Sequence, residues 1–215
     1  MTPSLTILQI GNAVVPWCSE VHWKRSLEAL GHTVRFVQEG PDCGNHARQI
    51  LRTEPIDLVL YTRTDGLKWD HGDAIDLWDL CRGRGIPTAS VHLDLFHGIA
   101  RRDVKATKAN ALFAVDTVFT ADGDHEAEWA AAGIDHHWLP PGVLYEECYL
   151  GTPRAEYRGD CAFVGSSSGY HSEHPRRKEL VAALERTFRR RLVRAGDGRT
   201  VREGALNDLY ASTWC

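Results

Sequence analysis

Two titratable side chains, His92 and Asp94, lie at the carboxyl end of TASVHL, residues 88–93, a segment with the composition of a buried strand. Ligands of open α/β sheets bind at the carboxyl ends of the strands, so both residues are candidates for catalysis. An imidazole and a carboxylate placed there can accept or deliver a proton. The alternative for His92 is structural, with its ring bonded to a neighbouring backbone group.

A loop farther along the chain has the composition of an anion-binding turn. Gly165, Ser166 and Ser167 follow the apolar segment CAFV, and their backbone N–H groups can bind a phosphate. Gly196 follows the next predicted strand and has the equivalent place at its end. The loop is not a Walker loop, because no Gly-Lys-Ser/Thr follows it.

Charge is distributed unevenly along the chain. Acidic residues outnumber basic ones over residues 1–150, and the balance reverses over residues 151–215. Arg176 and Arg177 lie in the first turn of a predicted helix, where positive charge opposes the helix dipole and indicates a nearby anion. The alternative is that these arginines, like the rest of the basic tail, form an ordinary solvated helix face.

The loop after the first predicted strand provides a third set of candidates. Gly11 and Asn12 end that strand, and Glu20 and His22 lie in the first turn of the helix that follows. These four residues can line a binding site on the acceptor side of a transfer reaction. In the competing interpretation Glu20 stabilises the helix dipole and His22 is a surface residue.

No group of residues has the spacing of a metal site. Asp122 and Asp124 form a DxD pair, which can bind a divalent cation, but they precede a helix and are interpreted as candidate N-caps. His125, His136 and His137 do not share a helix face, so a zinc site is rejected. The six cysteines contain no CxxC pair and are predicted to be reduced.

The elements that must position these residues alternate from the N-terminus onward. An apolar strand at 5–10 is followed by a helix at 19–31, with Ser19 as the predicted N-cap and Gly31 at its end. A second strand follows at 33–37. Short connections of this kind predict a β-α-β unit with parallel strands.

The same alternation continues along the chain and predicts a Rossmann-like, doubly wound parallel α/β sheet. Residues 98–112 are predicted to be helical but have a mixed pattern. The further strands are expected at 57–62, 88–93, 116–120, 136–139, 161–165 and 191–196, and the further helices at 46–53, 73–85, 124–133, 176–188 and 202–212.

The segment Pro-Pro-Gly at 140–142 ends the first series of elements, because two prolines remove two backbone donors. The sequence therefore predicts an N-terminal α/β domain over 1–143, a linker over 144–158 and a second α/β domain over 159–215. The second domain has only about two strands, so it is predicted to be incomplete.

Several segments, in this order, resemble GT-B glycosyltransferases and, within them, the CgeB-like, spore-maturation-type branch. The family has two α/β domains joined by a linker, with a ligand cleft between them. The similar segments are LEALGHTV (27–34), VHLD (91–94), VFTADGDHEAEWAAAGIDHHWLPPGV (118–143), CAFVGS (161–166) and LNDLYAS (206–212). The family's donor-side domain continues past the last of these, so the resemblance predicts a shortened one.

This resemblance implies a metal-independent transfer of a sugar from a nucleotide-sugar co-substrate, with no other cofactor. His92 occupies a place where the family often has a histidine close to the sugar. The acceptor is open: a glycan, a protein or a modified nucleic acid. No membrane span is present in the sequence, and a cytoplasmic protein is expected.

Two other functional classes compete with this hypothesis. A dinucleotide-dependent oxidoreductase is disfavoured, because the loop GNAVVPW (11–17) lacks the GxGxxG pattern. A non-catalytic binding module, or one half of a split enzyme, remains open because the second domain is short. An incomplete sheet also favours a homo-oligomer or a completing partner chain.

Overall fold

The computed structural model describes residues 3–63, 69–93, 95–97, 107–165, 176–196, 201 and 204–214. Asp94, Ser166 and Ser167, three of the predicted site residues, lie outside these ranges. Contacts between residues divide the chain into two compact units, with their main boundary in the sequence between Gly142 and Val143. We call them unit 1 and unit 2.

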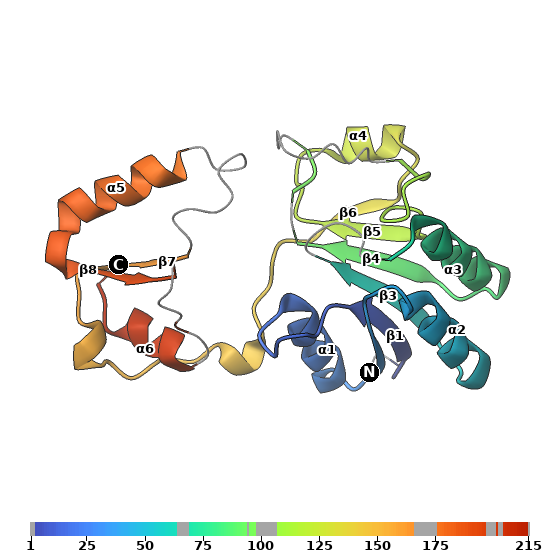
Figure 1. Ribbon diagram of the computed structural model, residues 1–215, viewed down its shortest axis with the longest axis horizontal. Coiled ribbons are helices and arrows are strands. Elements are labelled where there is room, and N and C mark those ends of the chain that lie inside the picture. Colours follow the sequence, from blue (N-terminus) through green and yellow to red (C-terminus); the bar gives the residue numbers. More distant parts are fainter. Residues whose placement is uncertain are drawn as a thin grey trace. The chain divides into compact units, whose positions relative to one another are not determined.

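Strands and helices alternate through both units (Figure 1), except that no helix is described between β4 and β5. The strands are β1 (Thr6–Gly11), β2 (Thr33–Gln38), β3 (Leu58–Arg63), β4 (Thr88–His92), β5 (Thr117–Thr120), β6 (His136–Trp138), β7 (Cys161–Val164) and β8 (Leu192–Ala195). The α-helices are α1 (Ser19–Ala29), α2 (Cys43–Thr53), α3 (His71–Gly83), α4 (Glu126–Ala131), α5 (Arg177–Phe188) and α6 (Gly204–Ala211). Short 3-10 turns are η1 (Tyr145–Glu147), η2 (Ala155–Tyr157) and η3 (Arg189–Arg191).

Unit 1 contains a six-stranded parallel sheet in the order β2-β1-β3-β4-β5-β6. Helices cover both of its faces, as a parallel sheet requires. One face packs against α2, α3 and α4 through Leu8, Ile10, Val59, Tyr61 and Val118. The other packs against Trp23 and Leu27 of α1 through Ile7, Leu60, Ala89 and Val91. Unit 1 is therefore Rossmann-like, and the predicted α/β class is confirmed.

Three local predictions are wrong. Cys18, not Ser19, is the N-cap of α1, and it makes no side-chain cap bond. The N-cap of α4 is His125, so neither Asp122 nor Asp124 caps that helix. Residues 107–112, the described part of the helix predicted at 98–112, form turns instead. Turn and cap geometry depends on backbone angles set by distant contacts, which composition does not reveal.

Unit 2 is built around the parallel pair β7 and β8, which α5 connects along the chain. Its described core is small: Val193, Ala195 and Leu209 are buried, with Tyr157, Ala162 and Val201 packed around them. Two-stranded sheets are marginally stable on their own. The rest of unit 2 must therefore pack on this pair to stabilise it.

The segment 144–158, predicted as a linker, is anchored on α6. Asp208 of α6 accepts hydrogen bonds from the Thr152 backbone N–H (2.7 Å) and from Arg154 Nε (2.5 Å). Asn207 donates to the Glu147 carbonyl oxygen, 2.9 Å away. A side chain at Gly151 would collide with the backbone of Asn207. Residues 144–158 thus form a strap across α6, and the carboxylate of Asp208 is its main anchor.

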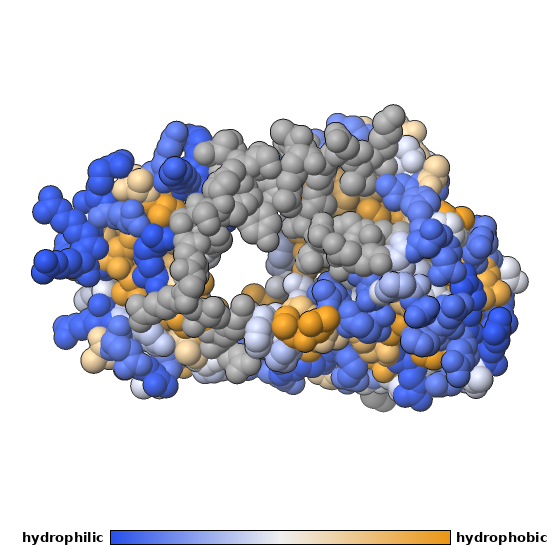
Figure 2. Space-filling model, viewed as in Figure 1, coloured by the Kyte–Doolittle hydropathy of each residue, from blue (hydrophilic) through white to orange (hydrophobic). Residues whose placement is uncertain are grey.

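Hydrophilic residues dominate the surface over α5 and over the outer sides of α2 and α3 in the view of Figure 2. The arginines of η3, Arg189 to Arg191, are exposed and extend the basic character of α5. Among the described residues, none of the helices has both the length and the apolar character needed to cross a membrane.

We predict that Asp208→Asn lowers the unfolding temperature of unit 2 by several degrees at neutral pH. The Thr152 N–H and the Arg154 guanidinium lower the pKa of Asp208, so the ionised carboxylate stabilises the folded state. This stabilisation is present above the ordinary aspartate pKa of about 3.9 and is lost as the pH falls through the lowered value. Thermal unfolding followed by circular dichroism at pH 7 and at about pH 3 measures both effects.

Glu179→Gln is the matched control, because Glu179 lies on the exposed side of α5 with only a 4.0 Å ion pair to Arg176. It should leave the transition unchanged at both pH values. Equal unfolding temperatures for wild type and Asp208→Asn at pH 7 would show that the strap is not anchored through this carboxylate.

Candidate functional site

The strand order reverses at β1, which lies between β2 and β3. The connection that follows β1 contains α1 and lies on one face of the sheet, whereas the connection that follows β3 contains α3 and lies on the other. In open α/β sheets, this topological switch point opens a crevice at the carboxyl ends of the two diverging strands. Gly11 ends β1 and Thr62 lies near the end of β3, so the residues predicted for the acceptor side lie at this edge.

Close packing at Gly11 joins β1, β3 and the start of α1. A Cβ at position 11 would lie 2.6 Å from Thr62 Oγ1 and 3.0 Å from Glu20 Cγ. Gln9 Nε2 donates to Thr62 Oγ1 (3.0 Å) and to the Glu20 carbonyl oxygen (2.9 Å). Glu20 is 3% exposed, so its side chain is buried, with Cγ beside Gly11. The predicted neighbours Gly11 and Glu20 therefore do lie together.

Asn12 shapes the loop between β1 and α1. Its Oδ1 accepts from the Val14 N–H (3.1 Å) and from Gln38 Nε2 (3.3 Å), and its carbonyl oxygen accepts from Cys18 Sγ (2.7 Å). His22 is half-buried and two residues beyond Glu20, so it projects from a different face of α1. Of the four predicted acceptor-side residues, His22 is the one that does not join Gly11.

His92 ends β4 but its ring lies inside the aromatic core of unit 1. It is 2% exposed and packs edge-on against Tyr61, Phe96 and Phe113, with ring centroids 5.3–6.2 Å apart. Its Nε2 lies 3.3 Å from the carbonyl oxygen of Leu112. This placement matches the structural alternative for His92, a bond to neighbouring backbone, and keeps the imidazole away from the surface of the edge.

The carboxylate of Asp122, interpreted from the sequence as a cap, holds the loop that follows β4. It accepts the backbone N–H of Phe96 at 2.9 Å and that of His97 at 3.1 Å. Thr120 Oγ1 also donates to it (3.1 Å), and Asp122 is 1% exposed. Its place just after β5 is the sequence signal that could have revealed it, since β5 ends at the same edge of the sheet as β4.

Four rings gather around this carboxylate. Trp129 is fully buried, with His136 stacked on one face at 4.6 Å and His97 edge-on at 4.8 Å. His97 in turn stacks on His125 at 4.8 Å. Burial lowers the pKa of His136. Three buried ring nitrogens of this group have no hydrogen-bond partner among the described residues: His97 Nε2, Trp129 Nε1 and His136 Nδ1. We call these four rings with Thr120 and Asp122 the histidine cluster.

At the carboxyl edge of unit 2, the backbones of the two predicted glycines meet. Gly165 N–H donates to the Ala195 carbonyl oxygen at 2.8 Å, and a Cβ at Gly196 would collide with the Gly165 carbonyl. Both glycines have positive φ, 145° and 111°, which other residues rarely adopt. Arg176 is the N-cap of α5 and is exposed, and Arg177 is the first residue of that helix.

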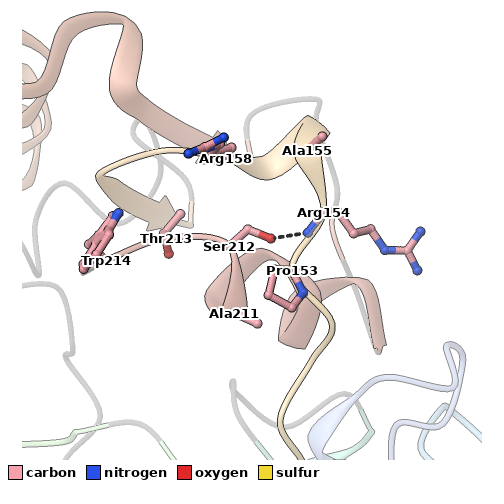
Figure 3. A pocket seen from close by; sticks show the side chains of 8 residues that line it. All are labelled: Pro153, Arg154, Ala155, Arg158, Ala211, Ser212, Thr213 and Trp214. Carbon is pink, nitrogen blue, oxygen red and sulfur yellow. Dashed lines mark hydrogen bonds between the residues drawn. The ribbon is translucent and has the colours of Figure 1, made fainter.

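A pocket of about 580 Å³ also lies in unit 2, and Figure 3 shows its lining side chains. Arg154 N donates to Ser212 Oγ (2.7 Å), while the Arg154 guanidinium points away from the other lining residues (Figure 3). The lining comes from Pro153, Arg154, Ala155 and Arg158, which precede β7, and from Ala211, Ser212, Thr213 and Trp214. The pocket is therefore at the amino end of β7, away from Gly165 and Gly196, and ligands of such sheets bind at the other end.

The possible metal ligands and the two most buried thiols among the described residues bear on metal-binding and thiol chemistry. Among the described residues, no three histidine, cysteine or acidic side chains are placed to hold a metal ion. Burial raises the pKa of Cys43 and of Cys81 to about 11. These two thiols are therefore protonated at neutral pH and are poor nucleophiles.

Comparison with known proteins does not identify a family. No family model matches the chain, and no curated protein is similar to it in sequence. From the geometry, the candidate functional site in unit 1 consists of two places at the carboxyl edge: the switch point around Gly11 and the histidine cluster. In unit 2 the equivalent place is the contact between Gly165 and Gly196.

We predict that Gly11→Ala destabilises unit 1 by about 1–3 kcal/mol, because the added methyl group overlaps Thr62 and presses on Glu20. Gly83→Ala is the matched control: no atom lies within 4 Å of a Cβ at that position, so this variant should be neutral or slightly stabilising. Urea unfolding of the two variants measures the difference. An unchanged midpoint for Gly11→Ala would mean that β1 and β3 can separate at no cost.

Proposed function

We propose that this chain is a nucleotide-sugar-dependent glycosyltransferase of the GT-B type, with the acceptor bound by unit 1 and the donor by unit 2. One observation carries the proposal: in both units, glycines end strands at the carboxyl edge in close backbone contact. Gly11 does this in unit 1, and Gly165 with Gly196 does it in unit 2. Such positions leave main-chain groups accessible where α/β proteins bind phosphates and sugars.

On the acceptor side, the proposed reaction needs a group that orients a hydroxyl and removes its proton. Glu20 supports this role through its burial beside Gly11 at the switch point. The burial of His92 favours a positioning role for its ring, which packs on Phe96 in the loop after β4. Asp94, beyond the described residues, stays a predicted catalytic group.

On the donor side, the leaving diphosphate needs positive charge and N–H donors, which can replace a metal ion. The N-terminus of α5 supplies backbone N–H groups and the positive end of the helix dipole. Arg176 and Arg177 add two positive charges at that end. The proposed enzyme works in the cytoplasm on a glycan, a protein or a modified nucleic acid.

The second candidate function is a binding module without catalysis. The small core of unit 2 favours it, because the described sheet has two strands and the core cluster on it contains three buried residues. A donor pocket built on so small a base needs a further strand beyond the two that are described. The two candidates differ in one property, which is the affinity for nucleotide-sugars.

Calorimetric titration of the purified chain with UDP-, GDP-, ADP- and dTDP-sugars tests the proposal. We expect one nucleotide to bind with micromolar affinity, and hydrolysis of that donor to follow on prolonged incubation. The absence of binding across all four would overturn the transferase proposal and favour the binding module.

Arg176→Ala is expected to weaken binding of that nucleotide about tenfold, the effect of losing one charge-assisted hydrogen bond. Arg186→Ala is the matched control, because Arg186 is exposed in the last turn of the same helix, far from its N-terminus. The same titration measures both variants. Equal weakening by the two changes would indicate a general charge effect and remove Arg176 from the donor site.

A further inference from the structure

The histidine cluster connects β6 to the loop after β4 by an unbroken series of hydrogen bonds. His136 Nε2 lies 2.8 Å from Thr120 Oγ1, and Thr120 Oγ1 lies 3.1 Å from Asp122 Oδ2. The Asp122 carboxylate then accepts the backbone N–H groups of Phe96 and His97. The position of the 95–97 loop is therefore linked to the state of the His136 ring.

The hydroxyl of Thr120 determines which nitrogen of His136 carries the proton. A hydroxyl has one hydrogen to donate and two lone pairs to accept with. Its hydrogen goes to Asp122 Oδ2, and one lone pair accepts the Asp122 backbone N–H at 3.0 Å. The other lone pair must accept from Nε2–H of His136. Nδ1 is thus the unprotonated nitrogen, and it is buried without a partner among the described residues.

A second proton on His136 therefore has to enter at Nδ1, inside the stack with Trp129. Burial is the largest influence on this ring and lowers its pKa, while the nearby carboxylates of Asp122 and Glu126 act in the opposite direction. His137 and His97 add to the lowering. A buried charge without a hydrogen-bond partner is costly, so the ring is neutral when the cluster is closed.

Other ionisable side chains also surround the loop. The imidazoles of His97 and His125 lie face to face, tilted by 24°. Glu128 Oε1 lies 3.4 Å from His125 Nδ1. His92 contacts Phe96 from the core side. Loop 95–97 is thus held between histidines on both sides.

We propose that the histidine cluster is an acid-sensitive latch, which holds the 95–97 loop against the carboxyl edge of unit 1 at neutral pH and releases it as the pH falls. The latch rests on the geometry of β4, β5, β6 and α4, and it does not depend on the proposed transferase activity. Its consequence is pH control of access to the edge where ligands of such sheets bind.

The direction of the pH effect follows from the lowered pKa of His136. The released state has an ordinary histidine, with a pKa of about 6.5, and takes up the proton first. The closed latch is therefore fully stable above that pH, and it loses stability as the pH falls toward the lowered pKa of the closed form. Because one proton is taken up, the equilibrium constant for closing the latch falls by at most about tenfold per pH unit.

Hydrogen exchange of the Phe96 and His97 backbone amides between pH 8 and pH 5 tests the latch. In the whole chain, we expect their protection, corrected for intrinsic exchange, to be constant above about pH 6.5 and to fall up to about tenfold per unit below it. The amides of Leu8 and Ile10 in β1 report global unfolding, and their protection should not change over the same range.

His136→Gln separates the latch from a general acid effect. Glutamine keeps an N–H donor for Thr120 Oγ1 but takes up no proton, so protection of the two loop amides should persist to lower pH. His46→Gln is the matched control, because His46 is an exposed histidine of α2 outside the histidine cluster, and its variant should behave as the wild type. The same decline in His136→Gln as in the wild type, or no decline in the wild type, would overturn the proposal.

A second measurement covers the case in which His136→Gln fails to fold, seen as lost protection in β1. Titration of the wild-type imidazole signals by NMR should then show His136 taking up its proton over the pH range in which Phe96 and His97 lose protection. A ring that titrates while both amides stay protected would equally overturn the latch.

Discussion

Burial of both faces of one parallel sheet is the constraint on which unit 1 depends. Parallel strands need crossover connections, and the crossovers place helices on both faces. Alternate residues of each strand therefore enter separate cores, one under α2, α3 and α4 and one under α1. Since every strand points the same way, all strand ends that lead into helices lie along one edge. Polar residues that could contact a ligand can therefore collect along this edge.

This edge combines buried polar groups with the close packing of the sheet. At the switch point, Gln9 bridges Thr62 and the start of α1, and the missing side chain of Gly11 makes room for both. Three strands away, Asp122 satisfies two backbone N–H groups of the loop after β4. Both arrangements leave hydrogen-bonding groups near the place where a ligand of such a sheet would lie.

Unit 2 is stabilised differently, because its described sheet is too small to form a stable core by itself. The strap at 144–158 compensates through the carboxylate of Asp208, which binds one backbone N–H and one guanidinium. The sequence of this segment has no regular period, which favours a linker. A linker and a strap have the same composition, and only the contact with α6 separates them.

The sequence by itself determines the kind and order of the elements, because the spacing of apolar residues and the helix-ending glycines act over a few residues. It also places Gly11, Glu20, Gly165 and Gly196 at strand or helix ends. Only the tertiary structure decides that His92 turns into the aromatic core, that Asp122 binds a loop rather than a helix end, and that His136 stacks on Trp129. Each of these depends on a partner at least seven residues away along the chain, and most on one more than fifteen away. The pattern of neighbouring residue types therefore cannot predict these partners.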